Sequence, residues 1–307
     1  MCNTEAARRG QTKPPAEFHI DARLVRALIA EQHSDLASLP IVEAGEGWDN
    51  RLFRLGDELL VRLPRRALSA AFVEHEQRWM PHLSPRLPLP VPVPLRAGRA
   101  GCGFPWSWSI AAWFPGASAL HTPPKDIAHA AATLGAFLRA LHEPAPQEAP
   151  GNAWRGIPLA NRTASMRAHL EQLVGSIDRV RVFALWERAL STPPWPGPPL
   201  WIHGDCHPGN LIVADGHLSA VVDFGDLTAG DPATDLSVAW MLLPASARPV
   251  FRDAARGSFD PVDDNTWMRA RGWALALGLA YVANSKGDDP LRNLGLATID
   301  AALAGEE

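Results

Sequence analysis

The stretch from Trp201 to Asp235 constrains the fold more than any other part of the chain. Its sequence is WIHGDCHPGNLIVADGHLSAVVDFGDLTAGDPATD. Short apolar runs alternate with segments rich in Gly, Pro and Asp, a pattern typical of strands joined by tight turns. The predicted hairpin carries Asp205 and Asn210 at the start of one strand, near Asp223 at the end of its partner. Two carboxylates and an amide would form an oxygen-rich site suited to a hard cation such as Mg2+.

The chain ahead of this stretch begins with a polar segment and continues with helix and strand patterns. Residues 1–16 predict a flexible tail, and apolar residues at helical spacing predict a helix over 20–33. Three short strands with glycine-containing turns then predict an antiparallel meander over 41–63. Its Gly45-x-Gly47 turn could place backbone N–H groups against phosphates, although most such glycine pairs are simply turns.

The other segments predict mainly helices. The clearest is an alanine-rich amphipathic helix over 127–141. Further helices are predicted over 67–83, 162–175, 178–190, 234–243 and 266–284, a proline-rich surface segment over 81–94, and a strand over 104–114. We therefore expect an α+β chain with a boundary near 113–118: a small domain over 17–115, built on an antiparallel sheet, and a larger, mainly helical domain over 116–307.

Composition excludes several classes of protein. The formal net charge is −4 with a pI near 6.3, so the chain lacks the basic footprint of a nucleic-acid-binding protein. No run of eighteen apolar residues predicts a membrane span, and the polar first residues are unlike a secretory signal. Cys2, Cys102 and Cys206 are too few for a disulfide framework. We expect a cytoplasmic protein, a monomer or weak dimer, without nucleic-acid or membrane partners.

Three motifs in the central stretch occur in a diagnostic order. They are HGDCHPGN at 203–210, VDFGD at 222–226 and GDPATDL at 230–236. Together they resemble the aminoglycoside phosphotransferase family, which has the bilobal protein-kinase-like fold. The separation between Asp205 and Asn210 also equals that between the catalytic-loop Asp and Asn of protein kinases. A protein kinase itself fits less well, because the loop reads His-Gly-Asp and no Ala-Pro-Glu motif follows Asp223.

The resemblance implies a role for each residue of these motifs. Asp205 would accept the proton of an acceptor hydroxyl or orient that hydroxyl, and His203 would support the loop. Asn210 and Asp223 would hold Mg2+ bridging the phosphates of ATP or GTP. Asp235 would brace the loop from the helix that follows. The implied reaction is transfer of the γ-phosphoryl group to a hydroxyl of a small molecule.

The nucleotide-binding residues match this family less closely. No lysine lies between Lys13 and Lys125, so Arg62 stands where the strand lysine is expected. Arginine keeps the positive charge but is not an equivalent residue. The remaining cofactor-binding expectations are Gly47 and Asn50 in the phosphate-covering turn, Glu76 (or, second, Glu74) as the partner of Arg62, and Ala111 to Trp113 against the purine. Arg62 could also be an ordinary surface residue of a strand.

The acceptor is the least constrained part of the interpretation. Residues 224–307 carry more acidic than basic side chains, which would attract a cationic acceptor such as an aminoglycoside, but the excess could equally serve solubility. His207, Asp226 and Asp231, together with Asp205, are the candidate acceptor contacts. A macrolide, an amino sugar or a metabolite alcohol remain alternative acceptors. A non-catalytic nucleotide-binding relative is a second class of function, and a zinc site at 203–207 is disfavoured by its crowded spacing.

Overall fold

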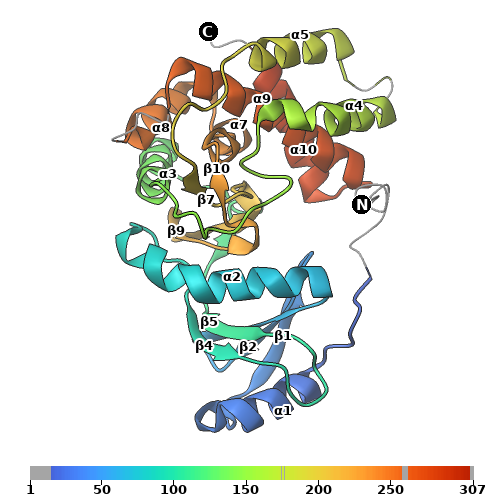
Figure 1. The fold of residues 1–307 in the computed structure, drawn as a ribbon, viewed down its shortest axis with the longest axis vertical. Coiled ribbons are helices and arrows are strands. Elements are labelled where there is room, and N and C mark those ends of the chain that lie inside the picture. Colours follow the sequence, from blue (N-terminus) through green and yellow to red (C-terminus); the bar gives the residue numbers. More distant parts are fainter. Residues whose placement is uncertain (1–14, 174, 176, 258–261, 305–307) are drawn as a thin grey trace. The chain divides into compact units, whose positions relative to one another are not determined.

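A computed structural model describes residues 15–173, 175, 177–257 and 262–304 (Figure 1). The chain forms two compact units: one extends to Pro115 and includes Val221–Gly225, and the other comprises residues 116–220 and those from 226 onward. The segment 221–225, which we placed in the second domain from sequence, therefore groups with the first. The predicted N-terminal tail lies almost wholly outside the described residues.

The first unit is a five-stranded antiparallel sheet with a helix on either face (Figure 1). The strand order is β1-β2-β3-β5-β4. Its elements are α1 (Ala22–Gln32), β1 (Ile41–Glu46), β2 (Asn50–Leu55), β3 (Leu59–Pro64), α2 (Ala67–Leu83), β4 (Pro94–Gly98) and β5 (Trp108–Ala112). The meander is β1-β2-β3, as predicted. Helix α1 begins where the Asp21 side chain accepts a hydrogen bond from Leu24 N at 2.8 Å.

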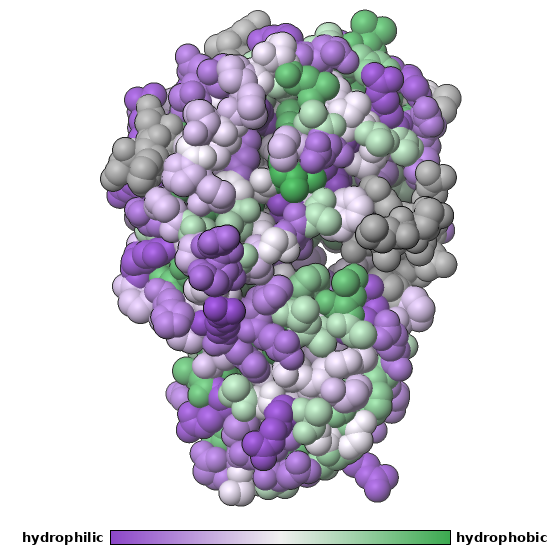
Figure 2. All heavy atoms as spheres, viewed as in Figure 1, coloured by the Kyte–Doolittle hydropathy of each residue, from purple (hydrophilic) through white to green (hydrophobic). Residues whose placement is uncertain are grey.

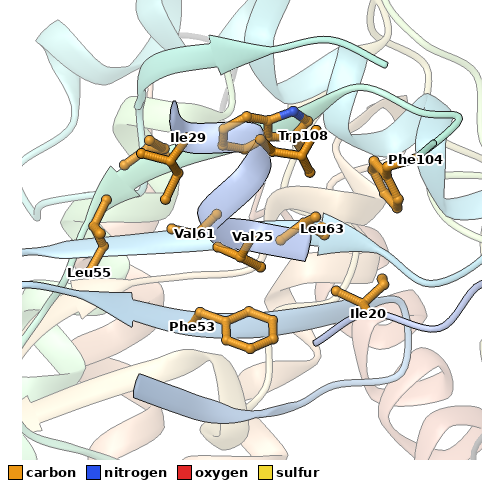
Figure 3. Close-up of a cluster of buried hydrophobic side chains, with 11 residues drawn as sticks. Ile20, Val25, Ile29, Phe53, Leu55, Val61, Leu63, Phe104 and Trp108 are labelled. Atoms are coloured by element: carbon orange, nitrogen blue, oxygen red, sulfur yellow. The ribbon is translucent and has the colours of Figure 1, made fainter. Parts of the chain in front are cut away.

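The alternation of side chains along β3 gives the sheet its two different faces. Val61 and Leu63 are fully buried in an apolar cluster with Phe53, Trp108 and residues of α1 (Figure 3). Each such side chain contributes roughly 1.5–3 kcal/mol on burial. Because successive side chains of a strand point to opposite faces, Arg62 is directed away from this cluster toward α2.

Two predictions for the first unit need correction. The proline-rich segment is not a surface-lying extended run: Pro81 lies inside α2, and Leu89 and Val91 are buried. It also leads into β4, which sequence did not predict. Pro94 is the first residue of that strand, one of the few strand positions that tolerate a residue without an N–H group. The strand expected over 104–114 is confined to β5.

The second unit is mainly helical. Its helices are α3 (Ile127–Leu141), α4 (Thr163–Gln172), α5 (Arg179–Leu190), α6 (Ala233–Leu236), α7 (Val238–Leu242), α8 (Arg248–Ala255), α9 (Asp264–Asn284) and α10 (Pro290–Leu303). Its strands form two small sheets: β7 (Leu200–Ile202) with β10 (Thr228–Gly230), and β6 (Ala117–Ser118), β8 (Leu211–Ala214) and β9 (His217–Val221) in the order β6-β8-β9. The turn at Asp215 and Gly216 has positive φ at both residues, as a tight hairpin requires.

Helix α9 is the central element of this unit. Small and aromatic residues are buried along most of its length, which is typical of a helix surrounded by others. It contacts α4, α5, α6, α7 and α10 (Figure 1). Its N-terminus is capped by Asp263, whose side chain accepts a hydrogen bond from Thr266 N at 2.7 Å.

Three features of the second unit differ from the sequence predictions. The helix expected over 234–243 is divided into α6 and α7 at Ser237, whose hydroxyl donates to Thr234 O and competes with regular helix bonding. Strand β10, which was not predicted, pairs with β7. Helices α8 and α10 were not predicted, although Asp289 before Pro290 is a recognisable helix start.

Figure 2 shows hydrophilic and hydrophobic residues intermixed over the face in view. Across the described ranges, no helix is long and apolar enough to cross a membrane.

Candidate active site

The loop from His203 to Asn210 leaves β7 and ends in a short 3₁₀ turn, Pro208–Asn210, before β8. Only glycine suits position 204. Its φ is +85°, and a Cβ there would overlap the carbonyl oxygen of Asp226. The glycine of the HGD motif is therefore required because the backbone at 204 closely approaches the backbone at 226.

Asp235 at the start of α6 anchors this loop. Its Oδ2 accepts a hydrogen bond from His203 N at 2.7 Å, and its Oδ1 accepts one from Gly204 N at 2.8 Å. His142 Nε2 lies 3.1 Å from Oδ2, and both side chains are fully buried. A buried carboxylate with this many donors fixes the backbone in one conformation. His203 adds a local contact, because its Nδ1 accepts from Asp205 N at 3.2 Å.

Asp205 is held between two side chains. Arg155 Nη2 lies 3.0 Å from Oδ1, and His207 Nε2 lies 3.5 Å from Oδ2. His207 Nδ1 accepts from Gly209 N at 3.0 Å, so Nε2–H is assigned as the ring donor that faces Asp205. Burial alone would raise the pKa of Asp205, but His207 and then Arg155 outweigh it and hold that pKa well below its usual range. Asp205 is thus an ionised carboxylate at neutral pH.

Asn210 and Asp223 carry the ligand types that suit Mg2+. In the second unit, Asn210 Nδ2 donates to the backbone oxygen of Asp205 at 2.9 Å, which leaves the amide oxygen as the atom able to bind a cation. In the first unit, Asp223 has a left-handed φ of +65° and a side chain 54% exposed, with Oδ1 3.3 Å from Arg62 Nη2. The exposed carboxylate oxygen of Asp223 and the amide oxygen of Asn210 are each of the type that a hard cation binds.

The zinc alternative has no structural support. Among the described residues, no group of three or more His, Cys, Asp or Glu side chains is placed to hold a metal ion. Cys206 is buried, and burial raises the pKa of its thiol well above the usual value, so it is a poor nucleophile.

Arg62 forms ion pairs with two carboxylates of the first unit, those of Glu76 and Asp223. Its Nη1 lies 2.9 Å from Glu76 Oε1 on α2, and its Nη2 contacts Asp223. The pairing of Arg62 with Glu76 is as predicted, and Arg62 is not a surface residue, since its side chain is 7% exposed. Burial disfavours the charged guanidinium, but the carboxylates of Glu76 and Asp223 outweigh it and raise the pKa of Arg62.

The turn between β1 and β2 contains the other two predicted phosphate-contacting residues. Gly47 N donates to Asn50 O at 2.8 Å, which closes the turn. Arg65 Nη1 donates to Gly47 O at 3.4 Å and Trp48 O at 3.1 Å. The Asn50 side-chain oxygen is buried and has no hydrogen-bond partner within the described chain. The turn is thus closed by the Gly47–Asn50 hydrogen bond and held by Arg65, and both backbone groups of Gly47 have partners within the first unit.

Some of the backbone groups predicted to contact the purine already form hydrogen bonds within the sheet. Trp113 N donates to Glu58 O at 2.7 Å, so this amide cannot also bind a base. Its ring lies under Arg54, with the guanidinium carbon 5.3 Å from the ring centroid. Ala111 is a buried residue of β5, paired with Leu60 of β3. The Trp113 N–H is therefore occupied, and the prediction that backbone groups of Ala111 to Trp113 contact the purine rests on the other groups of this segment.

Asp226 and Asp231, both proposed from sequence as acceptor contacts, have different surroundings. Asp226 accepts from Asn152 Nδ2 at 2.7 Å and lies 3.6 Å from Arg155 Nη2, next to Asp205. Asp231 is 6% exposed and pairs with Arg269 Nε at 2.8 Å, while its Oδ1 accepts from Ala233 N. Asp231 therefore has a structural role, and we do not retain it as an acceptor contact.

Sequence reasoning missed three residues that surround Asp205. Asn152 and Arg155 lie between α3 and α4, in a segment with no helix or strand pattern, and Tyr281 lies near the end of α9. The Tyr281 ring is 5.7 Å from that of His207. No local motif marks these residues, although Arg155 stands next to a glycine in a non-helical segment and Tyr281 is the only tyrosine of the chain.

Comparison with known proteins is consistent with this geometry. The model of the phosphotransferase enzyme family matches residues 40–273. No curated protein sequence matches the chain. Among solved structures, aminoglycoside 2'-phosphotransferase-IIIa in its GDP complex aligns with a TM-score of 0.68 at 16% identity, over 92% of this chain and 99% of that one.

Two further solved structures also align with most of the chain. The GDP and kanamycin complex of APH(2")-IIia aligns with a TM-score of 0.66 at 18% identity, over 91% of this chain and 95% of that one. Macrolide 2'-phosphotransferase MphH from Brachybacterium faecium aligns with a TM-score of 0.57 at 21% identity, over 92% and 96%. At these low identities the structural alignments show the fold alone, which is the bilobal protein-kinase-like fold. Because the family model covers more than half of the sequence, the chain belongs to the phosphotransferase enzyme family.

Proposed function

We propose that this enzyme transfers the γ-phosphoryl group of ATP or GTP to a hydroxyl of an aminoglycoside-type antibiotic or a related small molecule, such as a macrolide. The observation that carries the proposal is Asp205, an ionised carboxylate on a loop fixed by Asp235. Phosphoryl transfer needs an oriented acceptor and neutralised phosphate charge more than covalent work by the protein.

Each residue has one task in this reaction. Asp205 orients the acceptor hydroxyl and takes up its proton. The acceptor oxygen forms the new bond to the γ-phosphorus, the bond from that phosphorus to the β–γ bridging oxygen breaks, and the nucleoside diphosphate leaves. Arg62, held by Glu76, supplies positive charge to the phosphates, and the turn at Gly47 and Asn50 covers them.

Asn210 and Asp223 are the residues that would hold Mg2+, which supplies charge neutralisation to the nucleotide phosphates when bound. The relatives support a nucleotide donor, since two of them were solved with GDP. They also support a small-molecule acceptor, since one was solved with kanamycin and another is a macrolide phosphotransferase. We further propose that the enzyme acts in the cytoplasm, without nucleic-acid or membrane partners.

The test is phosphoryl transfer from radiolabelled ATP and GTP, with Mg2+, to a panel of aminoglycosides, macrolides and simple sugar alcohols. Asp205→Asn should lower turnover by roughly 10²–10⁴-fold, the usual contribution of a positioned acid–base group. Asp215→Asn is the matched control, because Asp215 is an exposed hairpin residue of the same unit. Absence of any Asp205-dependent transfer over the panel would instead support a non-catalytic nucleotide-binding protein.

A further inference from the structure

Arg155 is held beside Asp205 by its own loop. Asn152 Oδ1 accepts from Trp154 N at 2.8 Å and from Arg155 N at 3.2 Å, which closes a tight turn. The next residue, Gly156, is wedged against β7 and β10: a Cβ there would lie 2.9 Å from Ile202 Cδ1 and 3.1 Å from Gly230 Cα. The position of Arg155 is therefore fixed by backbone packing, unlike that of an ordinary surface arginine.

The guanidinium of Arg155 bridges two carboxylates and retains unused capacity. Its Nη2 lies 3.0 Å from Asp205 Oδ1 and 3.6 Å from Asp226 Oδ2. Its Nε is buried and has no hydrogen-bond partner within the described chain. Burial disfavours the charged form, but Asp226 and Asp205 outweigh it and raise the pKa of Arg155, so the charge is permanent.

Tyr281 offers a second unused donor in the same neighbourhood. Its hydroxyl is buried without a hydrogen-bond partner among the described residues. Burial, and then the charge of Asp205, raise the pKa of this phenol well above its usual value, so the group stays protonated. Two buried N–H and O–H donors without partners are costly in a folded protein, and such groups are commonly satisfied by a ligand or by water.

The charges at Asp205 determine which acceptor the site favours. Asp205 and Asp226 together carry two negative charges, and Arg155 cancels one of them. An acceptor with several ammonium groups would meet a fixed positive charge next to the carboxylate that must orient its hydroxyl. A neutral oxygen beside that hydroxyl would instead accept hydrogen bonds from the free donors of Arg155 and Tyr281.

We propose that Arg155 is a specificity residue that makes the enzyme select a neutral or sparsely charged, oxygen-rich alcohol over a polyammonium acceptor. The inference rests on the proposed function and narrows its acceptor class to macrolide-like alcohols, at the expense of the aminoglycosides. The oxygen it requires is an ether, hydroxyl or carbonyl adjacent to the phosphorylated hydroxyl, placed to accept from Arg155 Nε and Tyr281 Oη.

The experiment uses the full chain with ATP and Mg2+, and three probes: kanamycin, the same compound with all its amines acetylated, and erythromycin, which has a single amine. Calorimetric binding and kcat/KM are measured for wild type, Arg155→Met, Arg155→Lys and Tyr281→Phe. Arg139→Met is the matched control, because Arg139 is an exposed residue of α3 in the same unit.

We expect wild type to favour the neutral or singly charged probes over kanamycin by at least tenfold. Arg155→Met should bind kanamycin at least tenfold more tightly than wild type does, because two uncompensated carboxylates then attract it. Arg155→Lys should retain the discrimination against kanamycin, while both it and Tyr281→Phe weaken the neutral probes through the loss of one donor. Arg139→Met should match wild type throughout.

Three results would overturn the inference. A wild-type enzyme that prefers kanamycin contradicts it, even if no Arg155 variant folds. Unchanged kanamycin affinity in a folded Arg155→Met variant contradicts it as well, as does a Tyr281→Phe variant with undiminished affinity for both neutral probes. If instead no probe is phosphorylated and ATP turnover does not depend on Asp205, the proposed function itself fails, a result distinct from a wrong acceptor class.

Discussion

Two buried carboxylates hold the functional residues of this enzyme in different ways. In the second unit, Asp235 accepts hydrogen bonds from the backbone amides of His203 and Gly204. In the first unit, Glu76 pairs with the side chain of Arg62. One carboxylate therefore fixes the course of a loop, and the other fixes the position of a charge.

The difference explains why one region keeps the family pattern and the other departs from it. Every residue except proline carries the same backbone N–H, so the Asp235 contacts require only an aspartate in place and a glycine at 204. The Glu76 contact depends on the length and shape of its partner. An arginine with its planar fork can reach Glu76 and Asp223 together, and it does so here in place of the expected lysine.

The largest expected effect is at Asp235. Asp235→Asn keeps one oxygen but turns an NH2 group toward an amide N–H, leaving buried donors unsatisfied. We expect a loss of about 3 kcal/mol in the free energy of unfolding. Chemical denaturation of wild type and the variant measures this loss, with Asp215→Asn as an exposed control within about 0.5 kcal/mol of wild type. A loss under about 1 kcal/mol would show that Asp235 does not hold the loop.

The counterpart in the first unit is Glu76→Gln, for which we expect a smaller loss of about 2 kcal/mol. The variant removes the main counter-charge of the buried Arg62, but Asp223 still lies 3.3 Å from the guanidinium and offsets part of the cost. Nucleotide affinity, measured by titration, should fall together with stability.

Glu74→Gln is the matched control for Glu76→Gln. Glu74 lies on the same helix, is exposed and accepts a hydrogen bond from Ser107 Oγ at 3.1 Å. Surface substitutions of this kind change stability by less than about 0.5 kcal/mol. Equal losses at 74 and 76 would mean that the Arg62 pair contributes nothing beyond an exposed carboxylate.

Local patterns were sufficient to predict much of this architecture. The three motifs predicted the loop, the β8–β9 hairpin and the anchoring role of Asp235, because the partners of Asp235 are backbone amides of the first motif itself. The spacing of apolar and polar residues predicted α2 and the β1-β2-β3 meander. The pairing of Arg62 with Glu76 was expected from the resemblance to kinase-like folds, in which a strand cation pairs with a helix glutamate.

The contacts of Arg155 and Asp231 could not be predicted in this way. Arg155 lies 50 residues from Asp205 in a segment without helical or strand periodicity, so no pattern brings the two together. Asp231 pairs with Arg269 across 38 residues, and only the packing of α9 decides that this aspartate is buried. The hydrogen bond from the Trp113 amide to Glu58 O, a tertiary feature, could not be predicted either.

Gly156→Ala tests the backbone packing that places Arg155. We expect a loss of about 2 kcal/mol, because alanine must adopt a φ of +66° and its Cβ also crowds Ile202 and Gly230. Gly287→Ala is the matched control: its φ is +58°, but a Cβ there has no neighbour within 4 Å, so only the backbone cost of about 1 kcal/mol remains. Equal losses in the two variants would show that Gly156 is not wedged against the sheet.

The smallest expected effect is the pH dependence of the Arg155–Asp205 pair. The pKa of Asp205 is lowered in the folded state, so its contribution to stability is complete above the ordinary value of 3.8 and is lost as the pH falls through the lower folded value. The stability difference between wild type and Asp205→Asn, about 1 kcal/mol for a partly exposed pair, should therefore be constant from pH 5 to 8 and shrink only below about pH 4. Urea denaturation without nucleotide or divalent cations measures it.

In an Arg155→Met background the decline should begin at higher pH, because burial then acts on Asp205 with His207 as its only remaining close counter-group. A decline centred between pH 5 and 7 in wild type would mean that burial outweighs both partners, and that Arg155 does not control the charge at which the acceptor binds.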